Sequence, residues 1–236
     1  MPECSGLELA RVIRQLEAFV STPIVYLSAE MDVDKQFTAL SLGVDDFLVK
    51  PIQPQHLVSS LSNRIERSRL LRSFMVRDSL TGLLNHTEIK DQQVREVARS
   101  ARMHTPLSFA MVDIDLFKQV NDTYGHPTGD RVIKSLARLL KQRLRETDVV
   151  GRYGGEEFAV IMGGTDGHTA MKVLNEIRND FARLRHLCGG IEFSVTFSCG
   201  IAEIMHFEDA NRIAEAADKA LYEAKNAGRN QLALAR

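Results

Sequence analysis

Three acidic residues, Asp113, Glu156 and Glu157, lie where a β-strand or a tight turn would place them at the edge of a sheet and could form a metal site. Asp113 and Asp115 lie at the end of the apolar stretch 107–114, and Glu156 and Glu157 directly follow a Gly-Gly pair. Two carboxylates at the end of an apolar strand are costly unless a positive group lies beside them, and the glycines permit a close backbone approach to a ligand. Carboxylate oxygens on such loops suit Mg²⁺, which keeps coordination positions for water and substrate phosphate. The pattern favours a metal site over an acidic turn that merely faces solvent.

Two cations near the C-terminus could hold phosphate. Lys225 and Arg229 are four residues apart, which on a helix is one turn on one face. Such side chains pair well with phosphate, although a solvated helix end would carry the same two residues. The chain has no Gly-x-x-x-x-Gly-Lys-[Ser/Thr] loop, so we expect bound phosphates to be held by metal, lysine and turn amides.

The elements that must position these residues alternate between helix and strand from residue 86 onward. The two short strands around the Gly-Gly pair predict a hairpin with an acidic tip. Together the elements predict an α/β domain. We expect helices over 86–103, 130–145, 168–186 and 209–227, strands over 107–114, 149–152, 157–162 and 192–203, and a polar loop through Asn121, Gly125 and Gly129.

The first part of the chain carries a shorter alternation that amounts to about half a domain. A helix without Gly or Pro follows Pro54 and predicts a linker, which we expect to pack on its neighbours rather than form a coiled coil. The predicted organisation is a truncated segment over 1–53, a helical linker over 54–76 and the second domain over 77–236. Before the linker we expect a helix over 7–16, a strand over 23–27, a helix over 34–42 and a strand over 47–49.

Composition limits the classes of protein to which the chain can belong. Its 236 residues suit two modest domains with real cores, since 44% of them are hydrophobic. The 30 basic and 31 acidic residues are balanced, which argues against nucleic acid as a partner. No apolar stretch approaches the ~18 residues of a membrane span, and the start lacks a signal-peptide pattern. Three distant cysteines indicate neither disulfides nor zinc, so we expect a cytoplasmic protein without a membrane partner.

The predicted hairpin resembles the signature of the GGDEF family of diguanylate cyclases, in its GGEEF form, at residues 152–158 (RYGGEEF). The resemblance covers about residues 74–236 and implies a central mixed sheet flanked by helices, similar to nucleotide cyclases and polymerase palms. Five further blocks follow the family's order, namely 78–85 (DSLTGLLN), 113–122 (DIDLFKQVND), 125–130 (GHPTGD), 198–202 (SCGIA) and 217–230 (ADKALYEAKNAGRN).

This resemblance implies an enzyme that condenses two GTP molecules into cyclic di-GMP. Each 3'-hydroxyl attacks the α-phosphate of the other GTP and expels pyrophosphate. Asp113, the carbonyl of Ile114, Glu156 and Glu157 match the family's metal ligands, and Glu156 also matches the base that activates the 3'-hydroxyl. Glu156 and Glu157 are thus the expected catalytic residues. The resemblance implies Mg²⁺, with Mn²⁺ as an alternative that accepts the same oxygen ligands, and a homodimer.

The same resemblance assigns the residues that bind GTP. Asn121 and Asp130 match the pair that recognises guanine, since a carboxylate can accept hydrogen bonds from the guanine N1 and N2 that adenine lacks. His126 lies in the same loop, where a packing role is an equal alternative. The other matched positions lie near the phosphates, and they are Phe117, Lys118, Lys225 and Arg229.

A second nucleotide site is implied by Arg145-x-x-Asp148, at the family's spacing from the Gly-Gly turn. There the product would bind as an inhibitor, because arginine can donate two hydrogen bonds to guanine and aspartate can accept from it. Arg178 is a further arginine expected at this site. The alternative for Arg145 and Asp148 is a salt-bridged helix end.

The segment 1–53 resembles the C-terminal half of a two-component receiver domain. Ser28 matches its switch hydroxyl, Phe47 its switch aromatic and Lys50 the lysine that pairs with a phosphoryl group. We expect this segment to serve folding or dimerisation rather than phosphorylation. Two other functions remain open for the whole chain: a module that binds GTP or cyclic di-GMP without turnover, and a purely structural dimerisation domain.

Overall fold

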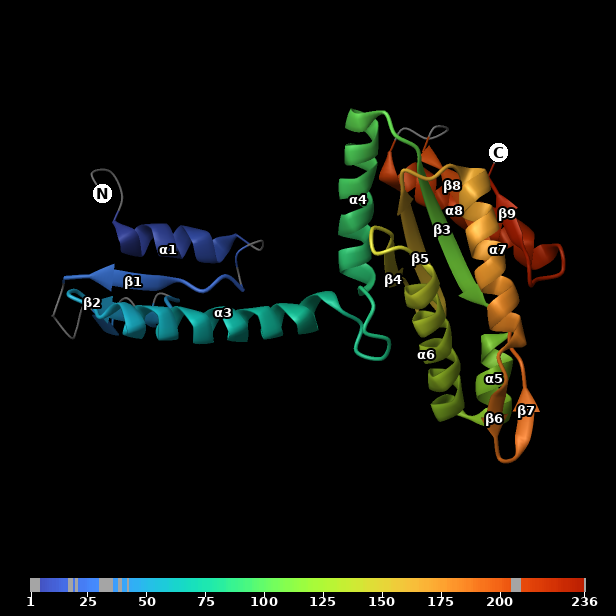
Figure 1. Cartoon of the computed structure of the whole chain (residues 1–236), viewed down its shortest axis with the longest axis horizontal. Helices are drawn as coiled ribbons and strands as arrows, with labels where there is room; N and C mark the ends of the chain where they lie inside the picture. Colours follow the sequence, from blue (N-terminus) through green and yellow to red (C-terminus); the bar gives the residue numbers. More distant parts are fainter. Residues whose placement is uncertain are drawn as a thin grey trace. The chain divides into compact units, whose positions relative to one another are not determined.

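The computed structural model describes residues 5–16, 19, 21–29, 36–37, 40–41, 43–204 and 209–235. The chain forms two compact units, residues 1–75 and residues 76–236. Figure 1 shows both, with colours that follow the sequence from the N-terminus to the C-terminus. No described helix is both long and apolar enough to cross a membrane. The three-part division expected from the sequence stays a prediction.

The first unit has a two-stranded parallel sheet. Its described elements are α1 (Gly6–Gln15), β1 (Val25–Ser28), β2 (Asp46–Val49) and α3 (Pro54–Val76). Helix α1 begins at a capping box in which Ser5 and Glu8 each bond to the other's backbone amide. The predicted helix over 34–42 lies largely outside the described residues.

Helix α3 packs on the other elements of its unit. Ser60 donates a hydrogen bond to Asp46 at 2.9 Å, and Arg64 forms an ion pair with the same carboxylate at 2.8 Å. Further along, Ser68 donates to the carbonyl of Ser21. The expectation that this helix packs on its neighbours is confirmed.

The second unit is built around a five-stranded mixed sheet in the order β4-β5-β3-β8-β9. Strands β8 and β9 are parallel, whereas the other neighbours are antiparallel. The sheet strands are β3 (Leu107–Ile114), β4 (Val149–Arg152), β5 (Glu157–Gly163), β8 (Phe197–Glu203) and β9 (Leu232–Leu234), with a separate hairpin of β6 (His186–Cys188) and β7 (Ile191–Phe193). The helices are α4 (His86–Met103), α5 (Phe117–Tyr124), α6 (His126–Arg143), α7 (Gly167–Arg183) and α8 (Ala210–Asn226).

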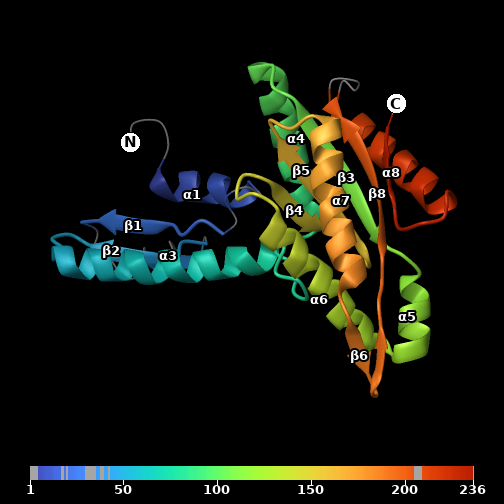
Figure 2. The ribbon, with the colours of Figure 1, turned by 45° about the vertical axis from the view of Figure 1, so that its right-hand side comes forward.

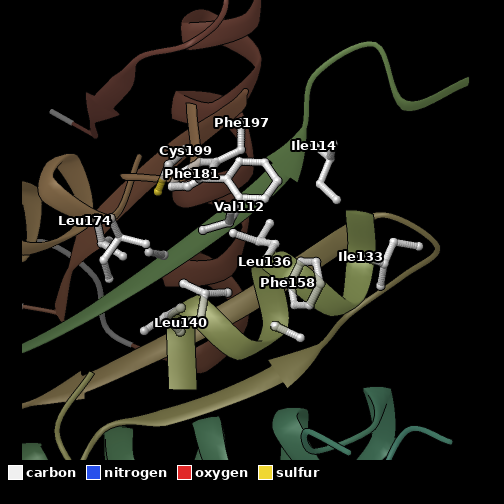
Figure 3. Close-up of a cluster of buried hydrophobic side chains, with 14 of the residues drawn as sticks. Val112, Ile114, Ile133, Leu136, Leu140, Phe158, Leu174, Phe181, Phe197 and Cys199 are labelled. Atoms are coloured by element: carbon white, nitrogen blue, oxygen red, sulfur yellow. The ribbon is translucent and has the colours of Figure 1, made fainter. Parts of the chain in front are cut away.

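Helices cover both faces of this sheet, as Figures 1 and 2 show. The fully buried strand β3 alternates between two cores, so that Val112 and Ile114 pack with α6 and α7 while Phe109 and Met111 pack with α4 and α8. Figure 3 shows the first core, where Val112 of β3 lies among side chains that include Leu136 of α6 and Phe158 of β5. The alternation places residue 113 on the side of α4 and α8, next to the end of the strand.

Two sequence expectations about this unit are wrong. Residues 117–124, expected in a polar loop, form α5, because Phe117 and Val120 are buried and the helix packs on α6. The expected strand 192–203 is divided, since β7 ends at Phe193 and β8 begins at Phe197. Strand β9 was not expected.

Candidate functional site

The acidic residues meet where β3 and β5 lie side by side. Asp113 is paired directly with Glu157 in the antiparallel register, and the amide of Ile114 donates to the carbonyl of Glu156 at 3.4 Å. Directly paired residues of antiparallel strands project on the same face with their Cβ atoms ~5 Å apart, and like charges there repel. The fold therefore brings three carboxylates to one edge and leaves two of them facing each other.

Burial raises the pKa of each of these three carboxyl groups, and a neighbouring carboxylate adds to the rise: Asp115 for Asp113, and Asp113 for the two glutamates. Burial is the largest cause for Asp113, opposed by the hydrogen bond and charge of Lys225. For Glu156 and Glu157 burial comes first and the negative charge of Asp113 second. A cluster in which each charge disfavours the next is an electrostatic site for a cation.

The turn before Glu156 and Glu157 depends on glycine and on one arginine. A Cβ atom at Gly154 would displace the Glu157 carboxylate, so glycine lets this carboxylate lie over the turn where the structure has it. Arg152 holds the turn by donating to the carbonyls of Gly154 and Gly155, both at 3.1 Å.

Arg152 also connects the turn to the start of the second unit. Its guanidinium forms an ion pair with Asp78 at 3.1 Å. Burial alone would raise the pKa of Asp78, but hydrogen bonds from Thr81 and the charge of Arg152 outweigh it and lower the pKa below the usual range. A half-buried arginine of this kind fixes the position of the acidic tip.

Lys225 and Arg229 approach the strand ends that carry Asp113, Glu156 and Glu157, which we call the acidic edge. The Lys225 ammonium lies 2.7 Å from Asp113, and the charge of Arg229 lowers the Asp113 pKa, which indicates that Arg229 is also near. The expectation of two cations on one helix face is wrong, because α8 ends at Asn226 and Arg229 lies in the following loop with φ 61°. Gly228, with φ 114°, ends the helical direction.

The residues expected to recognise guanine lie on a helical hairpin. Asn121 is in α5, Asp130 is exposed in α6, and exposed His126 begins α6 after Gly125, whose φ is 80°. The Asn121 Oδ1 atom is buried without a hydrogen-bond partner in the described part of the chain. A side chain at Gly129 would collide with this oxygen, so the glycine makes room for it.

The remaining expected phosphate neighbours differ in exposure. Phe117 is buried in the core beside α6, while Lys118 is exposed. Leu116, which precedes both, has φ 54° and starts α5 from a left-handed conformation. Of the Phe117 and Lys118 side chains, only that of Lys118 is accessible from solvent.

Asp113 and Asp115, which the sequence presents as a pair, have different surroundings. Asp115 is 6% exposed and accepts hydrogen bonds from the hydroxyls of Thr196 and Ser198. It also accepts one from the amide of Asn230, 115 residues away in the chain. Sequence reasoning assigned it no role, although hydroxyl residues on a neighbouring strand are a signal for a satisfied buried acid.

The second expected site lies on the surface near the start of β4. Arg145 and Asp148 line a cavity of about 680 Å³ together with Arg77 and Lys141. Asp148 accepts a hydrogen bond from the Arg145 amide at 3.0 Å, and the Arg145 guanidinium forms no ion pair with any described carboxylate. This does not match the alternative of a salt-bridged helix end.

Arg178 lies apart from these residues. It lines a different cavity, beside Asn175 and Gln231, and its guanidinium donates to the carbonyl of Asn230 at 2.9 Å. The structure therefore brings Arg145 and Asp148 together and places Arg178 next to the loop that carries Arg229.

The acidic edge fits a divalent cation by its chemistry rather than by a closed geometry. Within the described residues, no three His, Cys, Asp or Glu side chains are arranged to hold a metal ion in this conformation. The cation beside Asp113 is instead the Lys225 ammonium. Hard carboxylate oxygens that repel one another, next to a lysine and an arginine, suit a magnesium-bound polyphosphate.

Comparison with protein families identifies both parts of the chain. Residues 75–231 match the model of the diguanylate cyclase GGDEF domain, and residues 1–62 match the response regulator receiver domain. The expected family resemblances and the mixed α/β architecture are thereby confirmed.

Individual relatives agree with these families. The response regulator PleD of Caulobacter vibrioides is 33% identical over 95% of this chain and 52% of its own length. Diguanylate cyclase DgcP of Pseudomonas aeruginosa is 39% identical over 96% of this chain and 36% of its own length. The chain thus spans about half or less of these two relatives.

Solved structures share the fold of the second unit. The coiled coil and GGDEF domain of DgcB from Caulobacter crescentus, in complex with c-di-GMP, gives a TM-score of 0.70 at 31% identity over 77% of this chain and 98% of that one. The active GGEEF domain of a diguanylate cyclase from Vibrio cholerae gives 0.62 at 32% identity over 65% and 98%.

Proposed function

This chain belongs to the GGDEF family of diguanylate cyclases, and we propose that it condenses two GTP molecules into cyclic di-GMP and two pyrophosphates. The observation that carries the proposal is the pairing of Asp113 with Glu157 at the end of β3, beside Glu156 and opposite Lys225. Repelling carboxylates that a single lysine neutralises only in part are costly for folding and useful for binding a metal-bound triphosphate.

The metal ligands in this proposal are Asp113, the carbonyl of Ile114, Glu156 and Glu157. A bound Mg²⁺ or Mn²⁺ would neutralise charge on the α-phosphate and on the leaving pyrophosphate. Hard oxygen ligands do not distinguish strongly between the two metals.

Glu156 is the proposed base. Its carboxylate takes the proton of the 3'-hydroxyl as the hydroxyl oxygen attacks the α-phosphorus of the other GTP. The bond from this phosphorus to the bridging oxygen of the β-phosphate then breaks, and pyrophosphate leaves. The raised pKa of Glu156 supports this role, since a stronger base accepts the proton more readily.

The other proposed roles concern binding. Asn121 and Asp130 recognise the guanine edge with His126 nearby, while Lys118, Lys225, Arg229 and the backbone at Phe117 hold the phosphates. Each domain binds one GTP in this reading, so two copies must face each other and the active form is a homodimer. The product also inhibits by binding at Arg145 and Asp148; the position of Arg178 gives no support to its part in that site.

A module that binds GTP or cyclic di-GMP without turnover is the second candidate. Such a module would also bind a metal-bound triphosphate at Asp113, Glu156 and Glu157, so the acidic cluster alone does not distinguish the two candidates. Turnover is favoured because no position that the family's reaction requires is substituted in this chain.

Incubation with GTP and Mg²⁺, followed by identification of the product, tests the proposal. Cyclic di-GMP and two equivalents of pyrophosphate per product are expected from the wild type, and neither from Glu157→Gln. Binding of GTP without any product, at protein concentrations that saturate dimer formation, would favour the sensor. A matched control is Glu192→Gln, an exposed residue of β7 outside the acidic edge and outside the cavity of Arg145 and Asp148.

A further inference from the structure

Asp115 is a buried carboxylate that the proposed mechanism does not use. Its Oδ1 accepts from the Ser198 hydroxyl at 2.7 Å, and its Oδ2 accepts from the Thr196 hydroxyl at 2.6 Å and from the Asn230 amide at 3.0 Å. Its own amide donates to the Thr196 carbonyl at 2.9 Å. This carboxylate therefore joins three segments: the end of β3, the start of β8 and the loop after α8.

The loop that reaches Asp115 has an unusual backbone. Gly228, Arg229 and Asn230 all have positive φ, at 114°, 61° and 48°. Side chains rarely adopt this left-handed region, and two successive non-glycine residues there persist only where the surroundings determine them. The hydrogen bond from Asn230 to Asp115 is one such determinant.

A second contact holds the loop from the opposite side. Arg178 of α7 donates to the Asn230 carbonyl at 2.9 Å and to its side-chain Oδ1 at 2.5 Å. Asn175 and Asn179 in turn accept from the same guanidinium. Asn230 is thus bound through its amide, its carbonyl and its side chain.

The residue fixed by these contacts is the one before Asn230. Arg229 lies in the same left-handed stretch, and its charge acts on Asp113 at the acidic edge. Its own amide bonds to the Ala224 carbonyl at 3.2 Å, which sets where the loop leaves the helix. Freeing Asn230 would let the Arg229 side chain move away from the edge.

We propose that Asp115 is a positioning residue that, with Arg178, holds residues 229–230 in the left-handed conformation and so aims Arg229 at the triphosphate. The inference rests on the proposed function, because it takes a triphosphate as the ligand of Arg229. The two neighbouring acids at the end of β3 thus have different roles in this proposal. Asp113 faces the ligand, whereas Asp115 fixes the position of Arg229, which binds the ligand.

The test compares affinities for two nucleotides that cannot react, 3'-deoxy-GTP and 3'-deoxy-GMP, with Mg²⁺ present. Their ratio measures the contribution of the β- and γ-phosphates. Asp115→Asn keeps the shape of the side chain but places an amide N–H group against the donors that now bind the carboxylate. We expect the preference for 3'-deoxy-GTP over 3'-deoxy-GMP to fall about tenfold or more, as in Arg229→Ala. The double variant should show no further fall, because the arginine is already misplaced.

Two other variants distinguish positioning from general support of the fold. Thr196→Val removes a donor to Asp115 without touching Asn230 and should lower the melting temperature while leaving the ratio unchanged. Arg178→Met, on the surface of α7, should lower the ratio about threefold if its contact to Asn230 contributes as one ordinary hydrogen bond. A ratio unchanged in Asp115→Asn, or equally lowered in Thr196→Val, would overturn the inference.

Hydrogen exchange at the Asn230 amide provides a readout that needs no ligand. Asp115→Asn should exchange this amide at least tenfold faster while the amides of β3 stay protected. Equal protection in both proteins overturns the inference, whatever the nucleotide does. A wild type that binds neither nucleotide overturns the proposed function and the ligand assigned to Arg229, and exchange still decides whether Asp115 holds the loop.

Discussion

Acidic residues in the two units of the chain have opposite surroundings. At the start of β2, Asp45 faces Arg14 at 2.6 Å and Asp46 faces Arg64 at 2.8 Å. Asp45 also accepts from the Ile24 amide at 2.7 Å. At the end of β3, by contrast, Asp113 is paired with Glu157 across the strands, and Lys225 lies beside this group of acids.

The difference separates residues that stabilise from residues that carry function. A carboxylate with its own arginine and amide contributes to folding, whereas carboxylates that repel one another reduce stability until a cation arrives. Such unresolved repulsion is tolerated at functional sites. The two acid clusters can therefore be distinguished by substitutions that affect stability and rate in opposite ways.

The largest expected effect is that of Glu157→Gln on the rate. We expect formation of cyclic di-GMP to fall ~10² or more, since losing charge stabilisation at a phosphoryl-transfer centre commonly has this cost. Without metal, the melting temperature should stay equal or rise, because a group whose pKa is raised destabilises the fold when ionised.

Asp45→Asn is the matched substitution in the first unit. It weakens contacts to Arg14 and Ile24, so the first unit should lose about 1–3 kcal/mol of stability while the rate per folded protein stays unchanged. Measuring initial rates and thermal unfolding for both variants checks the comparison. Near-normal turnover in Glu157→Gln at saturating Mg²⁺ would remove this residue from the mechanism.

Asp130→Ala is expected to have the next largest effect. Its carboxylate is exposed, so stability should change by less than about 0.5 kcal/mol. The KM for GTP should rise about 10- to 100-fold, as for a charge-assisted hydrogen bond worth ~1.5–3 kcal/mol, and discrimination against ATP should fall. An unchanged KM and an unchanged preference for GTP would exclude guanine recognition by Asp130.

Arg145→Ala should relieve product inhibition without harming catalysis. An arginine that donates two charge-assisted hydrogen bonds contributes enough that its loss weakens cyclic di-GMP at this cavity about tenfold or more. Progress curves of the wild type should bend as product accumulates, and those of the variant should stay straighter until GTP is consumed. Equal curvature, with product still bound at the cavity of the variant, would assign the inhibition to the active site instead.

Sequence patterns predicted the parts of the fold that periodicity controls. Strand β3, helix α4 and strand β4 have the expected bounds, because continuous apolar runs and helical spacing are local signals. Helix α5 was missed because Asn121, Asp122 and Thr123 favour turns on their own, whereas burial of Phe117 and Val120 against α6 decides the conformation. Tertiary packing overrides a local preference there.

The candidate site was predictable in residue types but not in its supports. Motif spacing predicted Asp113, Glu156 and Glu157, and the register of β3 and β5 brings them to one edge. The bond from Asn230 to Asp115 joins residues 115 positions apart, and nothing local marks it. The left-handed backbone at Arg229 was equally hidden, because a helix continuing past Gly228 would have given the same four-residue spacing.

The smallest expected effect concerns His186. Like the carboxyl groups of the acidic edge, it is a titratable group whose pKa is shifted by burial, but it has no role in the proposed reaction. Its Nε2 atom is buried without a hydrogen-bond partner in the described part of the chain, among the rings of Phe181 and Phe193. Burial, and next the charge of Arg131, lower the pKa of His186 below its ordinary value of 6.5. The folded state therefore disfavours the charged imidazolium.

The sign of the pH dependence follows from this direction. Because the pKa is lower in the folded chain, the unfolded chain binds the proton first as pH falls below 6.5, and stability present above that pH is progressively lost. In His186→Phe this loss disappears, at most ~1.4 kcal/mol for each pH unit between the two pKa values. Urea unfolding at pH 7.5 and 5.5 measures it, with exposed His168→Gln as the control that should keep the wild-type slope. If the unfolding free energy of His186→Phe falls between pH 7.5 and pH 5.5 as much as that of the wild type, His186 is not the group that titrates. The unpartnered Nε2 atom would then have the same effect on stability at both pH values.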